Sequence, residues 1–176
     1  MITVGELLWP DPALRRLAAQ PEMDPLTEDG ALQEAQLLDV RFDALRSTVG
    51  LLFELRMALQ LREANTGVLV ARGVRELSWS TGGRSPAPRF AWVVAGSTVG
   101  TANRLFELRL TGLRPGAGLG LVAESAAFFA GDVPGLDRIP DYIEDDEATI
   151  RAQLAGWHSA FTPVHAVFLD PAPAMS

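Results

Sequence analysis

The sequence contains no cysteine and no lysine, so all 15 of its basic residues are arginine. Without cysteine, the chain can form no disulfide, carries no thiolate nucleophile and offers no sulfur ligand to a metal. Without lysine, it can form no Schiff base and holds no phosphate loop of the lysine type. These absences exclude several classes of enzyme, and we expect no cofactor.

Long apolar runs are also missing. No run approaches the roughly 18 residues of a membrane-spanning helix, and the first residues lack the basic and apolar regions of a secretory signal. The chain has 176 residues, of which 48% are hydrophobic and 21% charged, enough for one globular core. We therefore expect a single cytoplasmic domain over residues 1–176, without a membrane partner.

Four short motifs occur twice, in the same order and at a nearly constant offset of roughly 50 residues. The first set is Arg41-Phe42, Ser47-Thr48-Val49-Gly50, Leu52-Phe53-Glu54-Leu55-Arg56 and Leu69-Val70-Ala71. The second set is Arg89-Phe90, Ser97-Thr98-Val99-Gly100, Leu105-Phe106-Glu107-Leu108-Arg109 and Leu121-Val122-Ala123. This repetition predicts an internally duplicated three-strand unit.

Hydrophobic periodicity favours strands for the repeated block. Apolar residues occupy every odd position of residues 51–59, a period of two that is typical of a half-buried strand. A helix over residues 51–64, capped by Asn65-Thr66-Gly67, is the competing interpretation. We favour strands because the second copy runs into Thr111-Gly112, which a helix would resist. The six predicted strands are 37–44, 49–59, 68–79, 90–95, 105–113 and 119–129.

The predicted fold is therefore mainly β, an antiparallel sandwich or barrel with short flanking helices. Residues 1–36 form a helical lead-in, with Asp11 as a helix cap. Residues 37–80 and 89–130 form the two β units, joined by a Gly/Pro loop over 81–88. Residues 131–176 hold an acidic loop, a helix capped by Asp145 or Asp146, and a final strand over 164–169.

Negative charge is concentrated in one segment. Residues 131–150 carry seven acidic residues and one arginine, whereas the rest of the chain is nearly neutral. Such a segment repels nucleic acid and attracts a basic protein. We predict a non-catalytic binding protein that docks a basic protein partner through this segment. The predicted contact residues are Asp137, Asp141, Glu144, Asp145, Asp146 and Glu147.

Two matched polar pairs support an alternative function. Glu54 with Arg56, and Glu107 with Arg109, occupy equivalent places in the two copies. On a sandwich they would face water, but in a closed barrel they could surround a cavity and bind a small polar ligand or perform acid–base catalysis. A third possibility is a homodimer that pairs through an exposed strand edge.

Other candidate sites carry weaker signals. The two histidines, His158 and His165, do not have the spacing of a known two-histidine motif. Residues 144–147 do not match a calcium loop, and we expect no metal site. The glycines of residues 116–120 enter a predicted strand rather than a helix, unlike a dinucleotide fingerprint. Trp79, Trp92 and Trp157 are predicted to be core or rim aromatics rather than a stacking platform.

Residues 37–79 also resemble a known family. The matching residues are Leu38-Asp39-Val40-Arg41-Phe42-Asp43, then 49–55, Gly67-Val68-Leu69, Gly73-Val74 and Leu77-Ser78-Trp79. This stretch resembles the opening of bacterial immunity proteins related to the WapI-associated immunity proteins of contact-dependent toxin systems. The resemblance implies a small, β-rich cytoplasmic protein that binds and neutralises a toxin.

Overall fold

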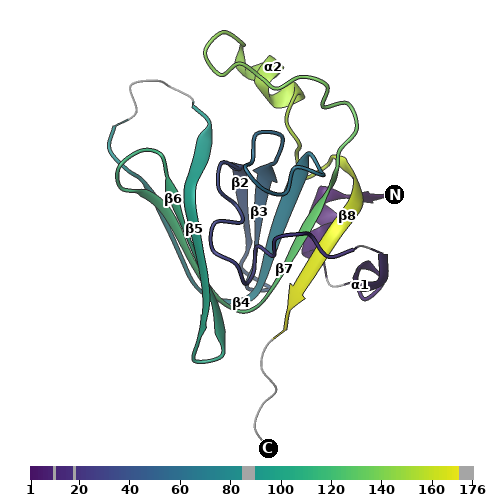
Figure 1. Ribbon diagram of the computed structural model, residues 1–176, viewed down its shortest axis with the longest axis vertical. Helices are drawn as coiled ribbons and strands as arrows, with labels where there is room; N and C mark the ends of the chain where they lie inside the picture. The colour runs from purple at the N-terminus through teal and green to yellow at the C-terminus, as the bar shows by residue number, and fades with distance from the viewer. Residues whose placement is uncertain (10, 18, 85–89, 171–176) are drawn as a thin grey trace, which may run out of the picture.

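The computed structural model of the protein describes residues 1–9, 11–17, 19–84 and 90–170 (Figure 1). Eight strands and a few short helical segments make up the fold. In chain order they are β1 Ile2–Thr3, η1 Val4–Leu8, α1 Leu14–Leu17, β2 Gln36–Asp43, β3 Thr48–Glu54, β4 Thr66–Thr81, β5 Trp92–Ala102, β6 Leu105–Gly112, β7 Ala117–Asp132, α2 Glu147–Ala152 and β8 Ala160–Leu169. The predicted mainly β, antiparallel class is confirmed.

Six of the strands form a ring. The pairing runs β2–β3–β4–β7–β6–β5 and returns to β2, and every step is antiparallel. The β2–β5 step is very short, because only Gln36 with Val93 and Leu37 with Trp92 are paired. The fold is therefore a barrel with one seam that opens beyond these two pairs.

The ring contains two three-strand meanders, β2–β4 and β5–β7, as the repeated motifs predict. The Leu-Phe-Glu-Leu-Arg motifs begin in the middle strands β3 and β6, and the Leu-Val-Ala motifs lie in β4 and β7. The Ser-Thr-Val-Gly motifs do not occupy equivalent places. Residues 48–50 begin β3, whereas residues 97–100 lie within β5, one strand earlier in its meander. Arg89, residues 85–88 of the 81–88 loop and the tail after Asp170 lie outside the described residues.

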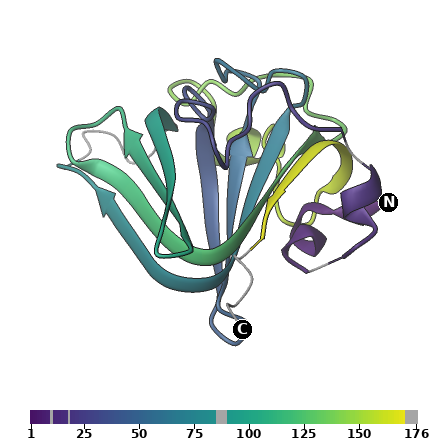
Figure 2. The ribbon, with the colours of Figure 1, turned by 60° about the horizontal axis from the view of Figure 1, so that its bottom comes forward.

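The two long strands β4 and β7 join the meanders. They pair with each other from end to end, and in Figure 2 they curve together along the base of the barrel. A bulge between Val74 and Glu76 interrupts the ladder where β4 bends. Gly73 precedes this bulge with a φ of +63°, a conformation that glycine adopts without strain. The bend lets one strand serve both halves of the ring.

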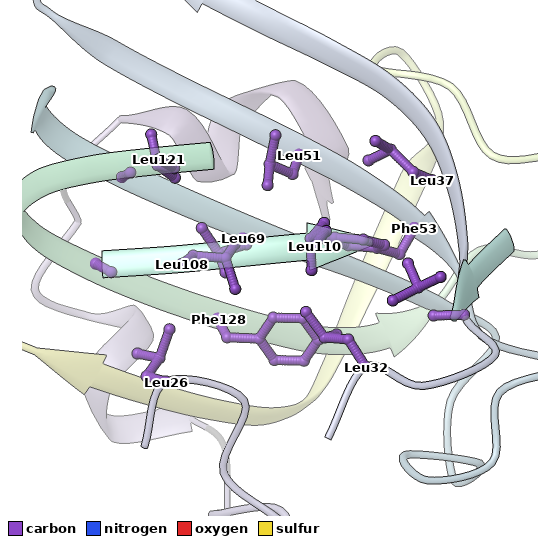
Figure 3. Close-up of a cluster of buried hydrophobic side chains, with 14 of the residues drawn as sticks. Leu26, Leu32, Leu37, Leu51, Phe53, Leu69, Leu108, Leu110, Leu121 and Phe128 are labelled. Atoms are coloured by element: carbon purple, nitrogen blue, oxygen red, sulfur yellow. The ribbon is translucent and has the colours of Figure 1, made fainter. Parts of the chain in front are cut away.

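The main core fills the inside of the ring. Alternate residues from the strands point inward, including Leu51, Phe53, Leu69, Leu108 and Phe128 (Figure 3). Leu26 and Leu32, which come from the loop before β2, close one side of the same cluster. Burial of these apolar side chains is the principal stabilising contribution to such a fold.

Strand β3 differs from its prediction in two ways. It ends at Glu54 instead of residue 59, because the chain turns at residues 55–58. It is also buried on both faces rather than one. Its outward residue Leu52 belongs to a second apolar cluster, which includes Val4 and Leu7 of η1 and Phe161 of β8. The N-terminal lead-in therefore covers the outer face of the sheet.

The predicted helix cap at Asp146 is present, since its side chain accepts a hydrogen bond from the backbone N–H of Thr149 at 2.7 Å. The predicted cap at Asp11 is not, because α1 begins only at Leu14; the Asp11 side chain instead accepts a hydrogen bond from the backbone N–H of Ala13 at 2.9 Å within the turn before the helix. The helices themselves are short, and α2 ends at Ala152. Within the described ranges, we find no helix with the length and apolar character needed to cross a membrane.

Candidate functional site

The acidic segment forms an arm that extends beyond the barrel. We define the acidic arm as residues 133–156, which connect β7 to β8 and include α2. In Figure 1 this segment lies above the open end of the barrel, over β2 and β3. The arm carries six acidic residues and two arginines.

Arg56 fixes the arm to the barrel. Its guanidinium donates two hydrogen bonds to the Glu54 carboxylate, from Nε and Nη2, each at 2.7 Å. It donates three more to arm carbonyls, to Leu136 at 3.0 Å, Arg138 at 2.9 Å and Gln153 at 2.6 Å. All five guanidinium N–H groups can be satisfied in this way. Because the Glu54 side chain is 1% exposed, the pair is a buried structural clasp.

Two further contacts hold the arm. Asn65 exchanges side-chain hydrogen bonds with the backbone of Val133, where the arm begins. The Tyr142 hydroxyl donates to the Gln36 side chain at 3.1 Å. Burial raises the pKa of Tyr142, and the nearby Glu54 carboxylate raises this pKa further. These contacts, with the clasp, define the position of the arm.

Several of the predicted docking acids shape the arm itself. The Asp145 carboxylate accepts hydrogen bonds from Arg138 at 2.6 Å and from the backbone N–H of Asp141 at 2.8 Å. These bonds, that from Arg138 first, lower the pKa of Asp145. Asp141 accepts from the backbone of Ile143 and Glu144. These side chains therefore maintain local structure.

Other side chains of the arm face solvent without such a role. Asp137 and Glu144 are exposed, and neither carboxylate bonds to any residue in the described ranges. Two large apolar side chains lie near them, Ile139 at 42% exposure and Ile143 at 86%.

A cleft of about 630 Å³ lies below the arm, where the seam between β2 and β5 opens. Residues 37–40 of β2 form one wall of the cleft, aromatic residues form the opposite wall, and residues of the arm complete the lining. The aromatic lining residues are Trp79, Phe90, Trp92 and Tyr142. Trp79 and Trp92 pack together, with ring centroids 5.1 Å apart, and Trp79 is 48% exposed. The volume is within the range of ordinary ligand sites.

The space continues around the edge of β2. A second cavity, of about 530 Å³, shares Leu38, Asp39, Arg151 and Leu154 with the first. The Asp39 carboxylate accepts a hydrogen bond from the indole N–H of Trp157 at 2.7 Å. Glu147 and Arg151 neutralise each other through a salt bridge at 2.8 Å. Asp39 is therefore the acidic group of the lining that no arginine in the described ranges pairs with.

The structure does not bring the two Glu/Arg pairs together. Glu54 and Arg56 form the buried clasp, whereas Glu107 and Arg109 are exposed on the outer face of β6. Glu107 and Arg109 line a shallow polar hollow of about 310 Å³ with Ser78 and Thr98. Because one pair is buried under the arm and the other faces outward on β6, the geometry gives no support to a shared catalytic cavity.

The histidines are also separate. His165 Nε2 contacts the Glu63 carboxylate, and His158 lies in the turn before β8. Among the described residues, no group of histidine and acidic side chains is arranged to hold a metal ion.

The cleft is the part of the site that sequence reasoning missed. Trp79 ends the first β unit and Trp92 begins the second, so the two residues flank the proline-rich loop. These places in the sequence do not show that the two indoles meet, and the contact is seen only in the structure. The interpretation as rim aromatics is compatible with their partial exposure.

Comparisons with known proteins add little. No protein-family model matches the chain, and no curated protein matches it. One solved structure, an uncharacterized protein from Neisseria gonorrhoeae, is similar over 57% of this chain and 94% of that one. The sequence identity is 14% and the TM-score is 0.45.

Proposed function

We propose that this protein is a non-catalytic binding protein that docks a basic protein partner on its acidic arm. One observation carries the proposal. Hydrogen bonds of Arg56 and Tyr142 hold the arm on the barrel, yet the carboxylates of Asp137 and Glu144 have no bonding partner in the described ranges. They lie beside the exposed side chains of Ile139 and Ile143. A held arm loses little conformational entropy on binding, which favours affinity.

The charges and the apolar residues have different roles in this proposal. The net negative charge of the arm accelerates encounter with a basic partner, an effect that weakens as salt is added. Ile139 and Ile143 supply apolar area that becomes buried in the complex. A toxin neutralised by an immunity-type inhibitor, the class suggested by the resemblance of residues 37–79, is one partner that meets these requirements.

A position-specific crosslinking experiment tests the proposal. A photo-reactive amino acid replaces Ile143, which is 86% exposed, and in a matched control it replaces Leu45, which is 94% exposed on the β2–β3 turn. We expect one basic protein to be captured from cells of the source organism at position 143 and not at position 45. Capture of the same proteins at both positions would contradict the proposal.

Kinetics with the captured and purified partner form the decisive step. The variant Asp137→Asn/Glu144→Gln should associate on the order of tenfold more slowly at low salt, because it lacks two steering charges. It should also depend less on salt, with unchanged thermal stability. The control variant Glu22→Gln/Glu107→Gln has the same net charge and alters exposed acids outside the arm. Equal association rates for the two variants would exclude docking on the arm.

A further inference from the structure

Most edges of the sheet are covered by the chain itself. Residues 29–35 run along β5, where the backbone bonds include Val94 N–H to Ala35 at 2.9 Å and Gly30 N–H to Ser97 at 2.9 Å. The outer edge of β8 is covered by β1 and by Ala19, which accepts from Ala166 N–H at 2.9 Å. Covered edges prevent unwanted strand pairing.

Within the described ranges two edges lack a ladder partner on one side, that of β4 over residues 75–81, which pairs with β7 alone, and that of β2, which borders the cleft. Strand β2 pairs with β5 at Gln36 and Leu37 but continues to Asp43, and from Leu38 onward its ladder partner within the described ranges is β3 alone. The N–H of Val40 is bonded to the Asp39 carboxylate rather than to β3, so it points into the seam. Antiparallel pairing alternates along a strand, and Phe42 N–H therefore points the same way.

The free edge of β2 borders the large cleft. Residues 37–40 form one wall of the cleft, and the opposite wall consists of Trp79, Phe90 and Trp92. The outward-facing backbone of β2 lies beside an aromatic hollow; the Val40 N–H is already bonded to Asp39, and the Phe42 N–H matches the requirements of added-strand recognition. In that mode the backbone bonds provide affinity, and pockets for alternate side chains provide specificity.

The charges of the cleft select the occupant. Asp39 on the edge strand carries the unneutralised charge of the lining, because Glu147 and Arg151 of the arm neutralise each other, and the other acids of the arm lie beyond the lining. A segment with alternating apolar and basic residues could place its apolar side chains against the paired indoles and its cations toward Asp39.

We propose that an extended, basic segment of the partner docks in this cleft by adding a strand to the free edge of β2 over residues 38–43. This inference rests on the proposed function, since it names the part of the basic partner that binds and how it binds. It places a second contact beside the arm surface formed by Ile139 and Ile143.

A defined peptide tests the inference without the natural partner. The probe is an acetylated and amidated hexapeptide in which arginine and valine alternate, titrated into the full chain at low salt and followed by tryptophan fluorescence. We expect saturable binding and slower amide exchange in residues 38–43. A citrulline peptide tests the charge, and a peptide with N-methylated valines tests the backbone pairing. Each should bind on the order of tenfold more weakly.

Two variants at one position separate pairing from folding. Phe42 is 54% exposed. Phe42→Pro removes the edge N–H and leaves the β3 ladder in place, whereas Phe42→Val retains the N–H. We expect Phe42→Pro to lose peptide binding and Phe42→Val to retain it, with both proteins folded by circular dichroism.

The remaining outcomes contradict the inference. Equal affinity for the N-methylated peptide would exclude strand addition, and equal affinity for the citrulline peptide would exclude a basic occupant. Absence of peptide binding would overturn the inference while leaving the crosslinking result at position 143 intact. A dimer by light scattering that Phe42→Pro dissociates would assign the edge to a second copy of this chain.

Discussion

Replacing Arg56 with methionine should be the most damaging single change that leaves the apolar core untouched. The substitution keeps the apolar stem and removes all five guanidinium hydrogen bonds. It leaves the Glu54 carboxylate buried at 1% exposure without its cation, and it frees three arm carbonyls.

The magnitude follows from the geometry of the pair. Removing one partner of a buried ion pair costs about 3–5 kcal/mol, because the other charge remains desolvated. The Arg56 side chain is 14% exposed, so water can reach part of the vacated site and the low end applies. We expect a loss of about 3 kcal/mol, which for a chain of this size lowers the Tm by roughly 6–12 °C.

Urea denaturation followed by circular dichroism measures this loss. The matched control is Arg151→Met, which breaks the salt bridge between Arg151 and Glu147. Both side chains of that pair are exposed, Arg151 to 76% and Glu147 to 64%. That variant should lose no more than about 0.5 kcal/mol. The double variant Glu54→Leu/Arg56→Met should be more stable than Arg56→Met alone, because it no longer buries an unpaired charge.

Amide hydrogen exchange tests the second consequence. In Arg56→Met, residues 133–156 should exchange faster, whereas β4 and β7 should be less affected. A loss of stability similar to that of Arg151→Met, or an unchanged exchange rate in the arm, would refute the assignment of Arg56 as the clasp.

Two other predictions follow from local geometry. Tyr142 is the single tyrosine, and its raised pKa predicts that ultraviolet absorbance will show phenol ionisation above the ordinary midpoint of 10.0; urea should restore the ordinary midpoint. Because the folded pKa is the higher one, the associated stability is complete below pH 10 and is lost as the pH rises through the folded pKa; an ordinary midpoint in the folded protein would contradict burial of this hydroxyl. A methyl group at Gly131 would overlap the Phe161 ring and the Thr162 carbonyl, whereas one at Gly100 meets open space, so Gly131→Ala should lose about 1–3 kcal/mol in urea denaturation and Gly100→Ala much less. Equal effects of the two glycine substitutions would contradict the packing of β7 on β8.

Some features of the fold could be predicted from the sequence because they depend on local periodicity. The alternation of apolar residues in 105–110 predicts strand β6 and its buried face, and the structure confirms both. The cap at Asp146 was also predictable, because a capping side chain bonds to backbone two or three residues away.

Strand β3 shows where local patterns fail. Glu54 lies between apolar residues, and alternation alone predicts that it faces water. It is buried because Arg56 and the arm, more than 80 residues later in the chain, cover this face. No pattern within residues 49–59 contains that information.

The candidate site divides in the same way. The sequence by itself determined the approximate positions of most strands, the order of the two meanders and the concentration of acids in residues 131–150, because propensity, periodicity and charge are properties of neighbouring residues. It did not give β1 or the bounds of β5, which runs from Trp92 to Ala102 rather than over 90–95. Only the tertiary structure decided which acidic side chains have a bonding partner, where the seam opens, and that Trp79 and Trp92 meet beside the edge of β2. These features depend on contacts between residues far apart in the chain. Such contacts bury some side chains and pair others only after the ring of strands has formed.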